Sequence, residues 1–325
     1  MTGSAAAAPG LGRGALLSVY LLTPALLAVA LLDGWAGGGA IRDALPSSPA
    51  ALPFYTLVFG IPHVLASFFL LADRELARNA GRIVVPSAAV AGAAALAAVA
   101  FFDQRQVGLA MVVTTMVHVL GQQTGLAAGQ AGLRAAGAPR GVGLWRALLA
   151  GTGLAAGAAV GGESLVPVVD SPQHWLLAAG VCLLLSTPLA AWLGYTARQR
   201  GGDVRALLSI QATVATGYGL LLFGYPVLCI WLFRFVHDAT AFMVYGTVAR
   251  TRALAAPRAN RMYAWLGLRG AWLGWALWPL AIVLTALSAV VLPPVCFIAV
   301  VWAHYLAEHR LWRRGSPLRQ WLPMH

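Results

Sequence analysis

Residues 226–249 read PVLCIWLFRFVHDATAFMVYGTVA, an apolar run of about two dozen residues with three ionisable side chains near its middle. A helix of this length crosses the hydrocarbon core of a bilayer, which is about 30 Å thick, because each residue rises about 1.5 Å. The run therefore predicts a membrane-spanning helix. Arg234, His237 and Asp238 need a reason to be there, since ionisable groups inside a bilayer are costly unless they are paired.

The same pattern recurs along the whole chain. Of the 325 residues, 60% are hydrophobic and only 10% are charged, whereas soluble domains carry about 25% charged residues. We therefore predict an all-α, polytopic transmembrane bundle, a single integral membrane domain covering 1–325 with an N-terminal tail at 1–13 and a basic tail at 313–325. About ten spans are expected, at 14–33, 51–72, 83–102, 108–129, 144–162, 174–194, 206–224, 226–249, 270–291 and 294–312.

The arginines predict the orientation of these spans. The net charge is +12 and all 22 basic residues are arginine. With ten spans, 19 of them fall in alternate loops and tails, whereas the opposite loops hold only Arg42 and Arg105. An excess of arginine in short loops marks the cytoplasmic side, so both termini are expected in the cytoplasm of a bacterial-type inner membrane. Nucleic-acid binding is not expected, because no basic face with interleaved aromatic residues is visible.

Polar and ionisable residues concentrate in four of the expected spans. Each of these spans carries one histidine near its middle, namely His63, His118, His237 and His304. All four spans run inward from the outer face, and the histidines lie about 10 to 12 residues from the outer end, or about 15–18 Å deep. Convergence of the four histidines would let each buried polar group satisfy another. We therefore predict one shared metal site near the middle of the bilayer.

Helical spacing adds further candidate ligands to the histidines. Residues four apart share a helix face, which places Gln122 beside His118 and Glu308 beside His304. Asp238 follows His237 and is expected either to reach the site or to pair with Arg234. His309 is included among the candidate ligands, although it sits off the His304 face and nearer the cytoplasmic boundary. Histidine and carboxylate ligands without thiolate suit iron, manganese or zinc.

Several segments resemble the histidine-motif integral-membrane oxygenases and desaturases. GIPHVLASF around His63 resembles a G-x-P-H-G segment of the bacterial Brp/Blh carotene-cleaving oxygenases. HVLGQQTG at His118, FVHDATAF at His237 and HYLAEHRLWRRGSP at His304 resemble the separate histidine blocks of membrane proteins of that general type, including members of natural-product pathways of the enediyne or polyene kind. The chain lacks the H-x-x-x-H and H-x-x-H-H boxes of the fatty-acyl desaturases. It also has Ala66 and Ser67 where the carotene-cleaving enzymes carry an aspartate.

The resemblance implies a metal-dependent oxidative enzyme, a desaturase, hydroxylase or oxygenase, acting on a lipid-soluble hydrocarbon or polyene. It implies iron as the metal, either as a di-iron centre or as a single ion, with another divalent metal as the alternative. Dioxygen, membrane lipids and an electron-donor protein would be its partners. The expected catalytic residues are the four histidines with Glu308 and Asp238.

Three other functions are compatible with the same residues. Two histidines on neighbouring helices could ligate a haem, although the chain lacks paired histidines about 13–14 residues apart on one helix, as in b-type cytochromes. The histidine and carboxylate set could instead serve a proton or metal transporter, which inverted sequence halves would favour, and none is found. A purely structural membrane subunit is the remaining alternative.

Overall fold

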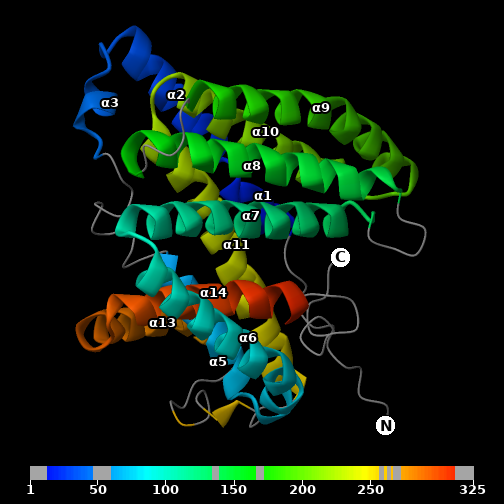
Figure 1. The fold of residues 1–325 in the computed structure, drawn as a ribbon. Helices are drawn as coiled ribbons and strands as arrows, with labels where there is room; N and C mark the ends of the chain where they lie inside the picture. Colours follow the sequence, from blue (N-terminus) through cyan, green and yellow to red (C-terminus); the bar gives the residue numbers. More distant parts are fainter. Residues whose placement is uncertain are drawn as a thin grey trace. The chain divides into compact units, whose positions relative to one another are not determined.

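The computed structural model describes residues 13–46, 60–133, 139–165, 172–255, 260–261, 265 and 272–311. Within these residues the chain is almost entirely helical and contains no strand (Figure 1). The one β-type contact among them is an isolated bridge between Asp73 and Asn260. The all-α fold class predicted from the hydrophobic runs is confirmed.

Five described helical stretches are long and apolar enough to cross a membrane, and they cover 14–35, 80–101, 141–160, 172–199 and 226–253. The protein is therefore a helical membrane protein. Each of the other predicted spans also contains a helix in its described part, but residues 51–59 of the second span and 270–271 of the ninth lie outside the described residues. The count of ten spans and the cytoplasmic position of both termini stay predictions.

The helices gather into two compact units built from non-contiguous segments. Unit 1 comprises 1–16, 54–101 and 238–325, and unit 2 comprises 17–53 and 102–237. The division falls inside α11 (Pro226–Ala255), a continuous helix whose consecutive residues His237 and Asp238 belong to different units. The sequence predicts that 1–325 forms one membrane domain, which requires the two units to assemble, and this stays a prediction.

Unit 2 is a helical bundle with its own apolar core. Its helices are the end of α1 (Arg13–Val19), α2 (Leu22–Trp35), α3 (Ala40–Ala44), α7 (Gln104–Gln130), α8 (Gly141–Leu165), α9 (Pro172–Gln199), α10 (Val204–Leu222) and the first part of α11. Helices α7, α8 and α9 lie side by side, and α10 packs against all three (Figure 1). Asp103 begins α7 with a capping box shared with Gln106, which satisfies backbone N–H groups at the helix start. Gly224, at φ +81°, separates α10 from α11 at the boundary predicted between the spans 206–224 and 226–249.

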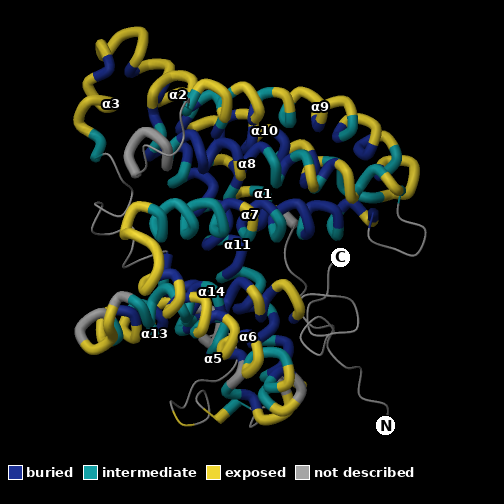
Figure 2. The backbone as a smooth tube through the Cα atoms, viewed as in Figure 1, coloured by how far each residue is buried: buried dark blue, intermediate teal, exposed yellow. Residues whose placement is uncertain are grey.

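Unit 1 contains α5 (Ile61–Phe69), the short 3-10 helix η3 (Leu70–Ala72), α6 (Arg74–Phe101), α13 (Trp272–Val291), α14 (Pro294–Leu311) and the later part of α11. Helix α14 packs along α6, and α5 contacts both α13 and α14. The break between α13 and α14 falls at Pro293–Pro294, as the sequence predicts. In Figure 2 the long α6 shows an exposed face along its length, with Val85, Leu96 and Phe101 well exposed, as lipid-facing positions of a membrane helix would be.

Candidate metal centre

Helix α5 places His63 and Ser67 on one face of unit 1. Pro62 lies in the first turn of the helix, where its missing N–H has no intrahelical partner to lose. His63 and Ser67 are four residues apart and therefore lie one above the other on the helix surface. His63 is completely buried, which is costly for an imidazole unless its ring nitrogens have partners.

Helix α14 brings a second pair with the same spacing. His304 and Glu308 are four residues apart, and the exposed fractions of their residues are 0% and 2%. A carboxylate in so dry a position must be paired or must coordinate a cation. The sequence prediction that His304 and Glu308 share a face is therefore confirmed by their contact, a distance of 3.4 Å between His304 Nε2 and Glu308 Oε2.

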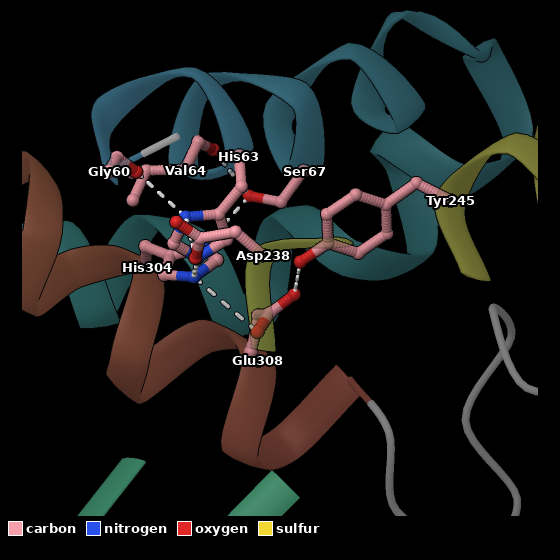
Figure 3. A network of polar contacts seen from close by, with 8 residues as sticks. All are labelled: Gly60, His63, Val64, Ser67, Asp238, Tyr245, His304 and Glu308. Carbon is pink, nitrogen blue, oxygen red and sulfur yellow. Dashed lines mark hydrogen bonds and ion pairs between the residues drawn. The ribbon is translucent and has the colours of Figure 1, made fainter. Parts of the chain in front are cut away.

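The third helix at this cluster is α11, which contributes Asp238 and Tyr245. Asp238 is completely buried and Tyr245 is 1% exposed. Tyr245 donates its hydroxyl hydrogen bond to Glu308 Oε1. One carboxylate oxygen of Glu308 thus faces the phenol while the other faces His304 (Figure 3).

The ring of His63 is oriented by acceptors at Nδ1. This nitrogen lies 2.7 Å from the carbonyl oxygen of Gly60 and 3.0 Å from Oδ1 of Asp238. Both neighbours only accept hydrogen bonds, so Nδ1 must carry the proton. In the neutral ring Nε2 then presents its lone pair. The hydrogen bond of Nδ1 goes to Gly60, and Asp238 lies at ion-pair distance from the same nitrogen, so Asp238 reaches the site, one of the two placements that the sequence allowed for it.

The ring of His304 is oriented in the same way by Ser67. The Ser67 hydroxyl donates to the backbone carbonyl of Val64 at 2.7 Å, and its oxygen lies 2.9 Å from His304 Nδ1. Since the single hydroxyl proton is used on Val64, His304 Nδ1 is the donor to Ser67. Nε2 of His304 therefore also presents a lone pair in the neutral ring.

The two Nε2 atoms face each other at a distance of 3.1 Å, with ring planes at 81°. Together with Glu308 Oε2 they form a group of three electron-pair donors in unit 1 (Figure 3). Ligands about 2.1 Å from one metal ion, at angles between right and tetrahedral, lie about 3.0–3.4 Å apart. The separations from His304 Nε2, 3.1 Å to His63 Nε2 and 3.4 Å to Glu308 Oε2, fall in that interval, so each of these two pairs has the spacing of neighbouring ligands on a metal ion.

Apart from His309, the other sequence-predicted residues lie in unit 2. His118 on α7 and His237 on α11 contact each other, with ring centroids 5.2 Å apart and planes at 76°. Gln122 is partly buried one turn beyond His118, and its neighbour Gln123 accepts a hydrogen bond from Tyr20. The structure therefore brings the four histidines together as two pairs, one in each unit. Convergence of both pairs on one site stays a prediction.

His309 is placed differently from its neighbours on α14. It is exposed, whereas Glu308 is buried, as the sequence indicated by placing it off the His304 face. Tyr245 was not identified from the sequence. The signal that could have found it is its position seven residues after Asp238, which puts both side chains on one face of α11 two turns apart.

Comparison of the chain with protein-family models, with curated proteins and with solved structures finds no match.

Proposed function

We propose that His63, His304 and Glu308 bind one divalent metal ion within the membrane, and that the protein is a metal-dependent oxidative enzyme for a lipid-soluble substrate. Iron is the proposed metal. Two histidines and one carboxylate on one face of a metal are the ligand set of non-haem iron oxygenases, which leaves the remaining positions open for reactants. We propose a single ion because Tyr245 engages the second oxygen of Glu308, which leaves one oxygen to face a metal.

The observation that carries this proposal is the convergence of three electron-pair donors. Gly60, Asp238 and Ser67 are acceptors placed at the two Nδ1 atoms, so the Nε2 atoms carry lone pairs, and His304 Nε2 lies between His63 Nε2 and a carboxylate oxygen of Glu308. Three acceptors at such distances repel one another unless a cation lies among them. A metal ion satisfies all three, and the partners on Nδ1 are those that usually orient metal-ligating histidines.

Iron bound here would supply the capacity to activate dioxygen. The protein's own residues have three tasks around it. His63 and His304 provide neutral nitrogen ligands whose orientation is held by Asp238 and Ser67. Tyr245 holds Glu308 so that a single oxygen is presented. The buried apolar helices exclude water from the reaction, and a hydrocarbon or polyene substrate would enter from the lipid in a bacterial inner membrane.

The haem alternative fits the His63 and His304 pair poorly. Axial haem ligands lie on opposite sides of the iron, which separates their nitrogens by about 4 Å with the porphyrin between them. The two Nε2 atoms are 3.1 Å apart, the spacing of adjacent rather than opposite ligands. In the transporter alternative, the His63 and His304 rings would share an extra proton between their Nε2 atoms, whereas in the enzyme proposal a metal ion lies there.

The test is the metal content of the full-length protein purified in detergent, measured as metal per chain with an absorption spectrum on the same sample. We expect about one iron per chain and no Soret band. His304→Ala should lose the metal, whereas His309→Ala should keep it, because His309 is an exposed histidine five residues away on the same helix. A Soret band would establish haem. Absence of metal after reconstitution with ferrous iron would leave a proton relay and contradict the proposal.

A further inference from the structure

Helix α11 carries three polar residues at intervals of seven, Asp238, Tyr245 and Arg252. Seven residues are close to two helical turns, so the three side chains follow one face of the helix over about 21 Å. Each of them reaches a different element of unit 1. Asp238 lies beside His63 on α5, Tyr245 bonds Glu308 on α14, and Arg252 bonds the junction between η3 and α6. One face of α11 thus contacts every element that supplies the proposed ligands.

Arg252 is held in a buried ion cluster at that junction. Its Nε lies 2.8 Å from Asp73 Oδ2 and its Nη2 lies 3.3 Å from Asp73 Oδ1, a two-point contact that specifies direction as well as distance. Nη2 also bonds Glu75. Asp73 is 1% exposed and Arg252 is 9% exposed. Arg252 is therefore a buried, paired arginine, unlike the loop arginines that only mark the cytoplasmic side of a membrane.

Asp73 is itself tied to the end of α5. It accepts a hydrogen bond from the backbone N–H of Glu75 at 2.9 Å and thereby caps α6. Asn260 donates to the Phe69 carbonyl at 3.1 Å and forms a backbone bridge with Asp73. The last turn of α5 and the start of α6 are therefore both attached to Asp73, the residue that Arg252 of α11 binds.

Close-packed apolar residues fill unit 1 between this cluster and the proposed metal ligands. The core there includes Phe69, Leu70, Val248, Ala249 and Leu311, all at most 8% exposed. Protein interiors of this density transmit displacements instead of absorbing them. A shift of α5 along α11 at the ion cluster would therefore move His63 and Ser67 away from Asp238 and His304.

We propose that Arg252 is a remote positioning residue of the metal centre. By binding Asp73 it sets the register of α5 on α11, and this register places His63 Nε2 against His304 Nε2. The inference rests on the proposed function, because it assigns a support to that same site. The expected consequence is that loss of the ion cluster weakens metal binding without removal of any ligand.

The test is a titration of metal-free, full-length protein in detergent with Co²⁺ alone, which occupies nitrogen and oxygen sites and reports its ligand geometry in the visible spectrum. Arg252→Met should weaken Co²⁺ binding by about tenfold and shift the spectrum, since remote couplings of this kind change affinity by about 2- to 30-fold. Arg252→Lys keeps the charge but loses the two-point contact, so its Co²⁺ affinity should lie between those of the wild type and Arg252→Met.

Two controls separate positioning from general destabilisation. Arg205→Met removes an Arg–Asp pair of the same two-point kind, in which Nη2 lies 2.9 Å from Asp203 Oδ2 on the surface of unit 2. Leu277→Ala opens a cavity in the core of unit 1, where Leu277 is fully buried. Both should retain the wild-type cobalt spectrum and affinity, although Leu277→Ala lowers the melting temperature.

The outcomes distinguish the two proposals. If wild-type protein fails to bind Co²⁺, the proposed metal centre is wrong and the inference falls with it. If wild type binds and Arg252→Met binds equally well with the same spectrum, the positioning role is overturned while the metal centre stands. If Leu277→Ala weakens binding as much as Arg252→Met does, the effect is one of stability and the positioning role is likewise overturned. Arg252→Lys supplies the comparison if Arg252→Met does not fold.

Discussion

The two units bury polar side chains in opposite ways. In unit 2, Gln211 accepts a hydrogen bond from Trp145 Nε1 at 3.1 Å and donates to Ser186 at 2.8 Å and to Thr187 at 3.2 Å, so donors meet acceptors across three helices. In unit 1, His63, His304 and Glu308 turn electron-pair donors toward one another, and their remaining groups are occupied by Asp238, Ser67 and Tyr245.

The difference separates two uses of polarity inside a membrane. A network in which every donor has an acceptor is complete without a ligand and holds helices together. A convergence of acceptors is complete only with a cation, and its orienting partners serve to aim it. The unit 2 network also shows that buried polar groups alone do not indicate a site, because Gln211 is a buried polar residue like His304.

The largest expected effect that tests this distinction comes from Asp238→Asn. The amide cannot stabilise the Nδ1 proton of His63 as the carboxylate does, so metal affinity should fall by about 10- to 100-fold. The matched control is Asp33→Asn in unit 2, where Asp33 is a buried aspartate that accepts from the Tyr225 hydroxyl at 2.6 Å. Asp33→Asn should leave the metal dissociation constant unchanged. Equal losses in both variants would remove the distinction between the units.

The opposite signature is expected for Gln211→Leu. This change removes three hydrogen bonds and leaves the indole N–H of Trp145 without its acceptor, which should cost about 1–3 kcal/mol. The melting temperature of the detergent-solubilised protein should fall by several degrees, while bound metal per chain stays at the wild-type level. A loss of metal in this variant would mean that the Gln211 network supports metal binding and does not only hold the helices of unit 2 together.

The smallest effect is expected for Ser67→Ala. His304 loses the acceptor at Nδ1 that fixes its tautomer, so metal affinity should fall by about threefold, the equivalent of one hydrogen bond. Ser186→Ala is the control, because Ser186 plays the corresponding role of a single hydroxyl partner in unit 2. Titration of both variants with the same metal compares them directly. An unchanged affinity for Ser67→Ala would show that Ser67 does not control the His304 tautomer.

Much of the fold could be predicted from the sequence because the signals are local. Apolar runs predict membrane helices from length alone, and the turns at Gly224–Pro226 and Pro293–Pro294 follow from residues that cannot continue a helix. The pairing of His304 with Glu308 is also local, since residues four apart must share a face. The exposed position of His309 follows from the same helical geometry.

What the sequence by itself determined is which helices form and which of their faces carry histidine and carboxylate side chains. Only the tertiary structure decided that His63 faces His304, that Asp238 lies beside a histidine on another helix, and that Tyr245 and Arg252 contact different elements of unit 1 from one face of α11. The physical reason is that lateral contacts between helices depend on packing among residues separated by up to 241 positions. Helical periodicity specifies the direction of each side chain but not the helix that it meets.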